Sequence, residues 1–571
     1  MLKYNSVLAI ILLKYNIISY FAISLTDYFF IIFPEVRYSN ALTTDNGFLP
    51  IFGKNKINKM DCTAFTIPTI ALLPLLACTG HAEKNETEKP NIILFMVDDM
   101  GWQDTSVPFW KERTHFNNLY QTPNMERLAA QGMKFTQAYA YAVCSPTRTS
   151  LMTGMNAARH RVTNWTLRYN HSQDQHDDVL QMPVWNMNGL QPIDTVPHSV
   201  YATTLPQLLR DNGYHTIHCG KAHWGTIGTP GENPLNLGFD INIAGHAAGA
   251  PGSFMGEYNF SAVWRGGDHT WDVPGLEKYH GDSINLTHAL TTEAIAALDK
   301  ARETGKPFYL YMSHYTVHTP IEPDHRYIQK YRDMGLDERE ARYASMVEGM
   351  DRSLGDLMDY LDKNGLAENT IILFMSDNGG LSATARGGEP HRHNWPLKSG
   401  KGSAYEGGIR EPMLVTWPGK VQPGSVCNDY LIIEDFFPTI LEMAGVTGYQ
   451  TVQVIDGISF VPMLMEAGNT SAGCDLIWHY PNKWGASGPG IGTTSTIRSG
   501  DWKLIYWYKD QTYELYNIAD DIGEKNNLTE KNPQKAKELA LKLGQYLRSV
   551  KADRPLLKET GLPASWPDEI Q

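Results

Sequence analysis

Short apolar runs alternate with amphipathic stretches along the middle of the chain. Three runs are almost continuously apolar, which is typical of strands in a parallel sheet covered on both faces; they are 91–97, 307–312 and 370–375. Helices between them are predicted from helical spacing or from end signals, over 122–132, 204–212 and 343–361. Strands that alternate with helices predict an α/β sandwich around a largely parallel sheet.

The pattern changes from about residue 450. Short aromatic strands are predicted over 502–508 and 512–516, and a helix over 533–550 with Asn532 as its cap. We therefore expect a small sheet-and-helix unit at the C-terminal end. The expected division is a leader and tether over 1–88, a main domain over 89–449 and a C-terminal subdomain over 450–571.

The first part of the chain has the features of a leader. The stretch 8–33 is apolar but interrupted by polar residues, so it would make a poor transmembrane helix. A second apolar run, 67–78, has the length of a signal-peptide core. It ends in Leu-Leu-Ala-Cys, which resembles a bacterial lipoprotein cleavage box. We therefore expect a lipid on Cys78, a membrane anchor, and export to the periplasm or the cell surface of a bacterium.

The start of translation is a separate question. Met60 is the only Met between position 1 and the second apolar run, and we interpret it as the start, so that 1–59 would not be translated. The lack of positive charge just after Met60 argues against this, since three lysines lie just upstream. A plain secretory signal peptide is the alternative to a lipoprotein signal. Residues 81–89 are polar and would form a flexible tether.

Composition limits the partners of this 571-residue chain. Its 42% hydrophobic and 19% charged residues fit a globular protein, and its length favours two packed domains. The net charge of −13 argues against nucleic acid as a partner, because nucleic-acid binding needs a basic face. An anionic substrate would therefore need a local basic pocket. The six cysteines form no visible disulfide framework or zinc motif.

The segment around Cys144 has the features of an anion site. Residues 147–153 are predicted to form a short helix closed by Gly154, which would place Cys144 just before a helix N-terminus. Free backbone N–H groups and the helix dipole favour an anion there, and Arg148 adds a fixed positive charge. A lone Cys is otherwise a small core residue. The segment therefore predicts a pocket for an anionic group.

Acidic and amide side chains follow two of the predicted strands. Asp98 and Asp99 come directly after the first apolar run, and Asp377 and Asn378 follow another. Their oxygen atoms suit calcium or magnesium, and ligands bind at the carboxyl ends of strands in such sheets. Either pair alone is weak evidence, because Asp-Asn-Gly is a common turn. Together the two pairs predict a metal site.

The sequence Cys-Ser-Pro-Thr-Arg at 144–148, followed by Leu-Met-Thr-Gly, resembles the Cys-x-Pro-x-Arg signature of type I sulfatases. Thr147 stands where that family more often has Ser or Ala. The resemblance covers about 89–550. It implies an alkaline-phosphatase-like α/β sandwich with a large mixed, mostly parallel sheet, plus a small C-terminal domain of antiparallel sheet and helix.

The same resemblance implies the cofactors. A maturation enzyme would oxidise Cys144 to formylglycine (3-oxoalanine), whose hydrated aldehyde is the nucleophile that attacks sulfur. Arg148 would help to offset the sulfate charge. Calcium is the usual ion of the family, and the residues implied as its ligands are Asp98, Asp99, Cys144, Asp377 and Asn378.

Further motifs match the family in order. Gly-Lys-Ala-His at 220–223 implies that Lys221 holds a sulfate oxygen and that His223 contacts the formylglycine hydroxyls. A His-Thr-Pro element implies that His318 lies at the leaving-group oxygen; His314 is the alternative in that segment.

A Gly-Lys-Gly segment followed by Glu-Gly-Gly implies that Lys401 assists, with Lys398 as the nearby alternative. Together with the other motifs, it implies an exported sulfatase acting on a sulfated carbohydrate, such as a glycosaminoglycan or an algal polysaccharide fragment.

These motifs recognise only the sulfate, so the sugar must be selected at the rim of the site. Two Gly- and Trp-bearing insertions, 161–200 and 245–282, are predicted to be loops over the site. Aromatic, His and Arg side chains suit sugar rings and hydroxyls. The rim residues expected are Trp165, Arg392, His393 and His479. Two alternatives stay open: a phosphonate or phosphodiester hydrolase that uses the same formylglycine, and a non-catalytic lipoprotein that binds sulfated glycans.

Overall fold

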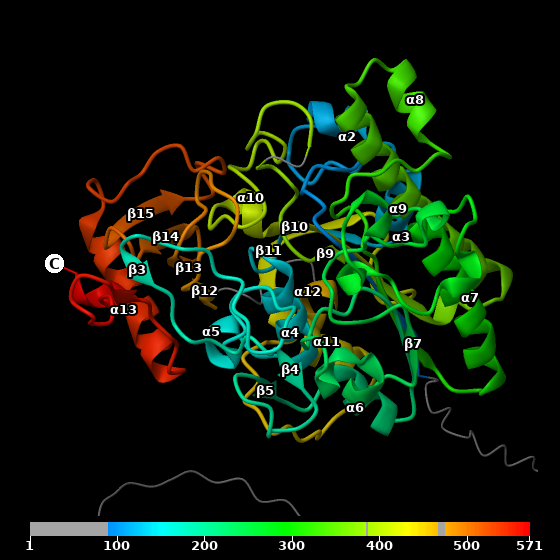
Figure 1. Ribbon diagram of the computed structural model, residues 1–571, viewed down its shortest axis with the longest axis horizontal. Coiled ribbons are helices and arrows are strands. Elements are labelled where there is room, and N and C mark those ends of the chain that lie inside the picture. Colours follow the sequence, from blue (N-terminus) through cyan, green and yellow to red (C-terminus); the bar gives the residue numbers. More distant parts are fainter. Residues whose placement is uncertain (1–88, 384–385, 466–473, 571) are drawn as a thin grey trace, which may run out of the picture. The chain divides into compact units, whose positions relative to one another are not determined.

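The centre of the structure is an eight-stranded sheet with helices on both faces (Figure 1). The computed structural model describes residues 89–383, 386–465 and 474–570. The strands, in their order across this sheet, are β11 (Ser425–Ile432), β2 (Met133–Tyr139), β10 (Arg410–Thr416), β9 (Thr370–Ser376), β1 (Asn91–Val97), β8 (Phe308–Ser313), β6 (His215–Gly220) and β7 (Ile241–Ile243). Within this sheet β10 is antiparallel to both of its neighbours, and all other pairs are parallel. The predicted mixed, mostly parallel sheet is confirmed.

Successive apolar side chains of a strand point to opposite faces of the sheet, and helices cover both faces. Along β1, Ile92 and Leu94 belong to one hydrophobic core, whereas Ile93 and Phe95 belong to the other. The first core includes residues of α4, α6 and α11, and the second includes residues of α3, α7 and α9. The helices are α2 (His115–Leu119), α3 (Pro123–Gln131), α4 (Cys144–Thr153), α5 (Ala157–His160), α6 (Leu205–Asp211), α7 (Leu286–Glu303), α8 (Ile328–Asp333), α9 (Glu338–Lys363), α10 (Glu406–Ile409), α11 (Phe436–Met443), α12 (Val461–Met465) and α13 (Pro533–Ser549).

The helix ends agree with the sequence signals, with two differences. Gly154 ends α4 in the left-handed conformation, with φ of 67°, as predicted. However, α4 begins at Cys144 itself. Pro146 is compatible with this start, because it lies in the first turn, where its missing N–H leaves no helical hydrogen bond unmade. Thr122 precedes α3, yet its hydroxyl accepts a hydrogen bond from the backbone N–H of Ser106 at 2.9 Å and does not cap the helix.

The C-terminal part is a four-stranded antiparallel sheet with one long helix (Figure 1). Its strands are β12 (Leu476–Tyr480), β13 (Thr494–Ser499), β14 (Trp502–Trp507) and β15 (Thr512–Asn517). Leu539 and Leu543 of α13 pack in one core with Ile497 and Leu504 of the sheet. The predicted sheet and helix are confirmed. The division at residue 450 stays a prediction, since all described residues belong to one compact unit.

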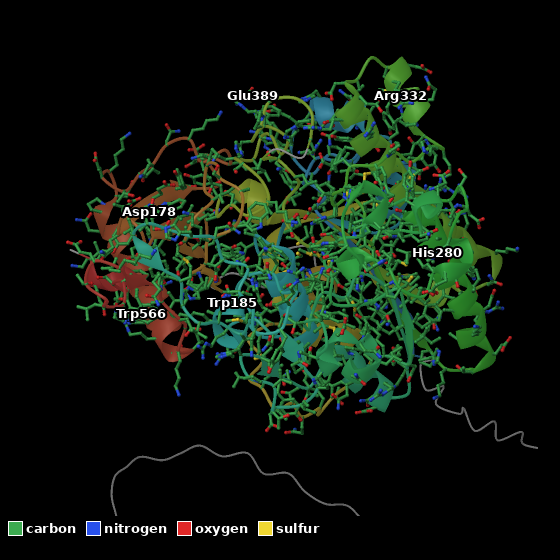
Figure 2. All side chains as sticks on the ribbon, viewed as in Figure 1. Asp178, Trp185, His280, Arg332, Glu389 and Trp566 are labelled. Carbon is green, nitrogen blue, oxygen red and sulfur yellow. The ribbon has the colours of Figure 1, made fainter. Side chains whose placement is uncertain are left out.

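The first insertion reaches from the large sheet to the C-terminal part. It contains the short pair β4 (Leu190–Gln191) and β5 (Val200–Tyr201), and its β3 (Leu180–Gln181) pairs with β16 (Leu556–Leu557). Asp178, labelled in Figure 2, belongs to this insertion and lies on the side of the C-terminal sheet. The backbone N–H of Leu190 donates to the carbonyl of Trp224 at 3.1 Å, so the insertion is also tied to the segment after β6 of the large sheet.

The predicted leader, with its lipidation site Cys78, lies outside the described residues. Among the described helices, none is long and apolar enough to cross a membrane. In the same part of the chain, four cysteines carry free thiols; they are Cys144, Cys219, Cys427 and Cys474.

Candidate active site

Four neighbouring parallel strands end at the same level. The register pairs Val97 of β1 with Ser376 of β9, and Ser313 of β8 with both Met96 of β1 and Gly220 of β6. The residues that follow these strands therefore meet at one edge of the sheet. They are Asp98 and Asp99 after β1, Asp377 and Asn378 after β9, Lys221 and His223 after β6, and His318 after β8.

Three carboxylates at this edge are each paired with a cation from a different segment of the chain. The pairs are Lys221–Asp98 (Nζ to Oδ2, 2.7 Å), Lys401–Asp99 (Nζ to Oδ1, 2.7 Å) and Arg148–Asp377 (Nη2 to Oδ2, 2.8 Å). All six side chains are buried. Their formal charges cancel, so a dication bound here would leave an excess of positive charge for an anionic ligand.

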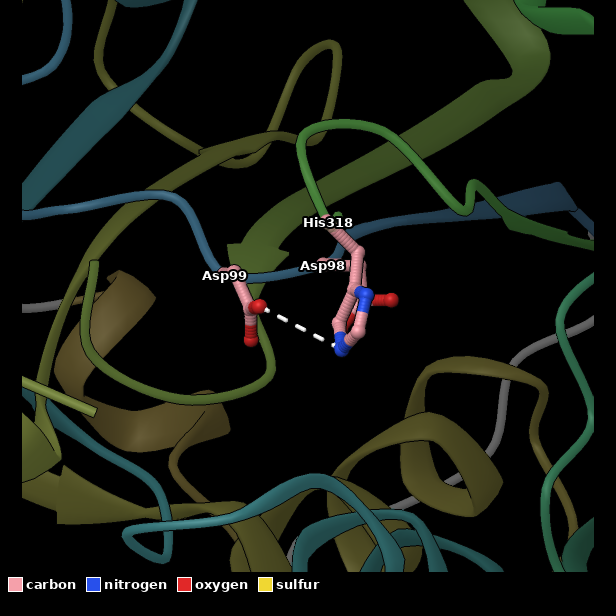
Figure 3. A group of neighbouring side chains, drawn as sticks. All are labelled: Asp98, Asp99 and His318. Carbon is pink, nitrogen blue, oxygen red and sulfur yellow. Dashed lines mark ion pairs between the residues drawn. The ribbon is translucent and has the colours of Figure 1, made fainter. Parts of the chain in front are cut away.

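The donor atoms at this edge fit a hard metal ion. One ligand atom each of Asp98, Asp99 and His318 lies within 4.8 Å of the other two. Asp98 Oδ1 and Asn378 Oδ1 are buried and accept no hydrogen bond from the described residues, which is costly unless another group engages them. Calcium prefers oxygen ligands. Figure 3 shows Asp99 facing His318, whose Nε2 lies 3.5 Å from Asp99 Oδ2.

Two predicted ligands stand apart from this group of atoms. Asp377 faces Arg148, although its Oδ1 also accepts a hydrogen bond from the backbone N–H of Asp99 at 3.3 Å. Cys144 lies in the first turn of α4 and is not among the clustered ligand atoms. Asn378 donates its Nδ2 to Asp99 Oδ1 at 2.7 Å. The described residues thus bring the predicted ligands to one edge without gathering all of their atoms around one point.

Burial and neighbouring charges set the ionisation of the site. Burial opposes ionisation of Asp99, but the charge of Lys401 and then that of His318 lower its pKa to about 2. Burial works against the charge of Lys401, yet Asp99 raises the pKa of that amine. Burial lowers the pKa of His318 to about 3, with Lys401 adding to the effect. At neutral pH, Asp99 is therefore ionised, Lys401 protonated and His318 neutral.

Helix α4 presents Cys144 and Arg148 one turn apart. Val143, which precedes the helix, has no capping side chain, so the first N–H groups are available to an anion. Arg148 Nη1 donates to Ser313 Oγ at 2.6 Å and to the carbonyl of Lys221 at 3.1 Å. Burial raises the pKa of the Cys144 thiol. The segment therefore holds a fixed guanidinium beside a neutral thiol.

Each of the two histidines has one ring nitrogen held by a carbonyl. His223 Nε2 lies 2.8 Å from the carbonyl oxygen of Thr166 and must carry its hydrogen there, whereas Nδ1 is buried with no partner among the described residues. His318 Nδ1 lies 2.9 Å from the carbonyl oxygen of Thr319, which leaves Nε2 toward Asp99. The free nitrogens are therefore Nδ1 of His223 and Nε2 of His318.

The two alternative residues weighed in the sequence take other places. His314 is buried with Nε2 2.8 Å from the hydroxyl of Ser353. Lys398 donates to the carbonyl of Glu524 at 3.0 Å and lies over the ring of Tyr405. Of the two histidines, His318 reaches the site, and of the two lysines, Lys401 does.

A cavity of about 450 Å³ opens above these residues. Its floor is formed by Cys144, His223, His318 and Lys401. Its walls come from both insertions and from the C-terminal part; they include Trp165, Gln173, Gln175, Gly249, Ala250, Pro251, Arg265, Trp271, Trp484 and Gly485. The prediction that both insertions lie over the site is confirmed.

A family model described as Sulfatase matches residues 90–446. The chain belongs to the sulfatase family. A second model, described as N-sulphoglucosamine sulphohydrolase, C-terminal, matches residues 397–553 of this sulfatase. The protein is thus a hydrolase of sulfuric esters, as the motifs predicted, and the alternative of a non-catalytic binding protein is set aside.

Named relatives and a solved structure match most of this sulfatase. A sulfatase from Formosa agariphila is 30% identical over 533 residues, which cover 84% of this chain and 92% of the relative. An N-acetylgalactosamine-6-sulfatase from Mus musculus is 30% identical over 445 residues, 72% of this chain and 76% of that one. The crystal structure of Ps i-CgsB in complex with k-i-k-neocarrahexaose is 27% identical, covers 81% of this chain and 93% of its own, and has a TM-score of 0.64.

Three of the four predicted rim residues lie away from the cavity of this sulfatase. Arg392 is exposed and pairs with Glu389, with Nε 3.5 Å from Oε1. His393 is buried and its Nε2 lies 2.5 Å from the carbonyl of Gly387. Both line a separate pocket, because the loop that carries them is anchored at Arg386, whose Nη1 lies 2.9 Å from Asp104 Oδ2. The prediction for Arg392 and His393 as rim residues is wrong.

The prediction for His479 is wrong as well, whereas Trp165 does line the cavity. His479 lies on β12 and is buried; its Nδ1 is 2.8 Å from the hydroxyl of Ser495 and its Nε2 2.8 Å from the carbonyl of Asp553. Both ring nitrogens are therefore used in packing the C-terminal part. Sequence reasoning missed Arg265, Trp271 and Trp484. The Gly- and Trp-bearing character of the second insertion was the only signal for Arg265 and Trp271, and Trp484 lies outside both insertions.

Proposed function

We propose that this sulfatase removes sulfate groups from a sulfated carbohydrate, with formylglycine derived from Cys144 and with calcium. The observation that carries the proposal is the cavity. Its floor joins Cys144 to the two histidines and to Lys401, and its walls present three tryptophans and two glutamines. Aromatic faces with a few directed polar groups suit a saccharide better than a small, featureless ester.

Two groups would complete the site. Calcium would be held by Asp98, Asp99, Asp377, Asn378 and the side chain of residue 144, and it would offset the negative charge of the sulfate. Formylglycine at position 144 would supply an oxygen nucleophile for attack on sulfur. The balanced charges and the buried free oxygens of Asp98 and Asn378 support this assignment.

The buried basic residues at this edge of the sheet would bind the sulfate. Arg148 is held by Asp377 and Ser313, so its guanidinium needs little reorganisation to meet an anion. Lys221 and Lys401 are held by Asp98 and Asp99 in the same way. An incoming sulfate would therefore meet cations that are already in place, together with the free N–H groups at the start of α4.

His223 would accept a proton from a hydroxyl of residue 144. Burial lowers the pKa of this His well below its ordinary value, with the charges of Lys221 and Arg148 adding to the effect. The ring is therefore neutral, with its hydrogen on Nε2 toward Thr166. Nδ1 is the basic atom that remains free.

His318 and Lys401 would serve the leaving-group oxygen. Lys401 keeps its proton, since Asp99 raises the pKa of its amine against the effect of burial. Burial lowers the pKa of His318 to about 3, so the ring is neutral. The negative charge of a sulfate ester beside it would favour the protonated ring. Protonation of the departing sugar oxygen by one of these two groups would release the sugar, and transfer of the hydroxyl proton of residue 144 to His223 would then accompany release of the sulfate.

The relatives support the substrate class. The chain is 30% identical to N-acetylgalactosamine-6-sulfatases and 27% identical to a protein solved with a neocarrahexaose. Both names point to carbohydrates. We therefore assign the substrate to sulfated saccharides of the glycosaminoglycan or algal type, and leave the sugar and the sulfated position to experiment.

The proposal extends to maturation and location. A formylglycine-generating enzyme would be the maturation partner, because the aldehyde must be made from Cys144. Export as a lipoprotein anchored through Cys78 would place the enzyme in the periplasm or on the cell surface, where large saccharides are available. Intact mass of the protein from a membrane fraction tests this, and an unlipidated chain starting after His81 would contradict it.

The catalytic proposal has a direct test. The protein is co-expressed with a maturation enzyme and incubated with a panel of sulfated mono- and oligosaccharides, and released sulfate is measured by ion chromatography. Peptide mass spectrometry should find an aldehyde at position 144, and Cys144→Ala should release no sulfate. A thiol at position 144 in fully active protein would rule out the formylglycine mechanism, and no release from any saccharide would rule out the substrate class.

A further inference from the structure

We infer that Arg265 forms a second anion-binding position in the cavity, so that the preferred substrate is a saccharide carrying another anionic substituent, sulfate or carboxylate, beside the sulfate that is removed. This inference rests on the proposed action on sulfated carbohydrates. It concerns the wall of the cavity and not the groups that bind the scissile sulfate.

The charge distribution of the cavity is the first observation. Among the described residues that line it, none is acidic, and Arg265 is the only charged side chain outside the floor. The chain as a whole has a net charge of −13. A lone positive wall residue in an acidic protein, inside the cavity that holds Cys144, favours an anion at that position.

The second observation is that Arg265 is not engaged elsewhere. Its side chain makes no hydrogen bond or ion pair with any residue in the described part of the chain. Glu322 feels its charge only at longer range, and that carboxylate already accepts hydrogen bonds from Ser253 Oγ at 2.7 Å and from the backbone N–H of Phe254 at 2.6 Å. The nearby Asp268 caps the turn at Thr270 and lies 3.9 Å from Arg168.

The third observation is that the wall carrying Arg265 is well fixed. The backbone N–H of Gly252 donates to the carbonyl of Trp271 at 2.6 Å, which joins two stretches of the second insertion. A Cβ atom on Gly252 would lie 2.3 Å from the backbone nitrogen of Ala262, so these stretches approach too closely for any other residue. A fixed backbone limits the conformational entropy that Arg265 loses on binding.

The chemistry of the neighbours narrows the ligand. Trp165, Trp271 and Trp484 line the same cavity and offer flat apolar surfaces, and Gln173 and Gln175 offer amides. A guanidinium binds either a sulfate or a carboxylate with two parallel hydrogen bonds. The fitting ligand is therefore a sugar residue with its own anionic group, a second sulfate ester or a uronate carboxylate.

The test compares saccharides that share one scissile sulfate. The probes are N-acetylgalactosamine 6-sulfate, the unsaturated chondroitin disaccharide with a 6-sulfate and a uronate carboxylate, and its 4,6-disulfated form; neocarrabiose mono- and disulfates form a second series. Matured wild type, Arg265→Ala, Arg265→Gln and Arg265→Lys are compared. Arg168→Ala is the matched control, because Arg168 is an exposed insertion arginine that does not line the cavity.

We expect Arg265→Ala and Arg265→Gln to lower kcat/KM at least about 10-fold on probes with the second anion, mainly through KM, and less than about twofold on singly charged probes. Arg265→Lys should retain most of the wild-type value. If kcat/KM falls on the probe with the uronate carboxylate, the anion is a carboxylate; if it falls on the disulfated probe, the anion is a second sulfate. Equal values for Arg265→Ala and wild type on all cleaved probes would overturn the inference and leave the proposed function standing. No cleavage of any saccharide by wild type would overturn both.

Discussion

Gly249 gives the sharpest test of the role of His223. A Cβ atom at this position would lie 2.3 Å from Cε1, 2.5 Å from Nδ1 and 2.7 Å from Nε2 of the His223 ring. The ring cannot easily move away, since it is buried and its Nε2 is bound to the carbonyl of Thr166. Gly249→Ala should therefore displace the imidazole by about 1 Å, a misplacement that can cost about 10²-fold in rate.

The expected result is a fall in kcat of about 10²-fold with a modest loss of stability, about 1–3 kcal/mol for an overpacked methyl group. Gly485→Ala is the matched control, because Gly485 lines the same cavity and an added Cβ meets no atom within 4 Å. That variant should keep its kcat within about twofold, as expected for a surface change without such a mechanism.

The assay is steady-state hydrolysis of a saccharide sulfate identified in the panel, with thermal unfolding measured in parallel. A double-mutant cycle with His223→Ala separates the mechanism from general damage, since the added methyl group has no ring to displace in that background. A wild-type kcat for Gly249→Ala, or an equal loss of kcat when His223 is already Ala, would refute displacement of the His223 ring as the cause.

Two further predictions follow from the described contacts. Exhaustive chelation should abolish sulfate release and lower the melting temperature, because a metal bound only to the native state stabilises it; readdition of calcium should restore both, and full activity after chelation would contradict the metal site. Glu524 and Glu406 share Lys503, with 2.9 Å from Nζ to an oxygen of each; burial, with the charge of Glu406 partly opposing Lys503, raises the pKa of Glu524 to about 7. Because the folded-state pKa lies above the unfolded value of about 4.3, the protonated Glu524 carboxyl stabilises the fold at low pH, and that contribution is lost as the pH rises. The free energy of unfolding should therefore fall between about pH 4.3 and 7, and Glu524→Gln should flatten that fall in urea titrations; equal slopes in the two proteins would contradict the raised pKa.

The edge of the sheet was predictable because its residues obey local rules. A continuous apolar run ends in Asp98-Asp99 and another in Asp377-Asn378, and parallel strands must bring such ends together. The positions of Lys221, His223 and Lys401 were predictable only through the family motifs. A lysine after a strand or in a loop has no periodicity that would mark it as part of a site.

Most residues at the rim of the cavity could not be predicted, because they come from segments far apart in the sequence. Arg265 and Trp484 reach the cavity from segments more than 200 residues apart, and no local pattern records that approach. His479 was predicted at the rim, although it does not line the cavity. Its residue type suggested a contact with sugar hydroxyls, yet β12 is buried along its whole length and both ring nitrogens are bonded within the protein. Residue type alone could not separate a sugar contact from a packing contact.

The pairing of charges explains how three segments far apart in the sequence are held at one site. The acids follow the ends of two adjacent strands, β1 and β9, whose parallel pairing fixes their relative position. Their partners come from α4, from the segment after β6 and from the segment before α10; they are Arg148, Lys221 and Lys401. Each acid therefore holds a cation from a segment that is not itself a strand of the sheet. Because a buried cation without its acid is costly, the same pairs that organise the site tie its three basic segments to the central sheet.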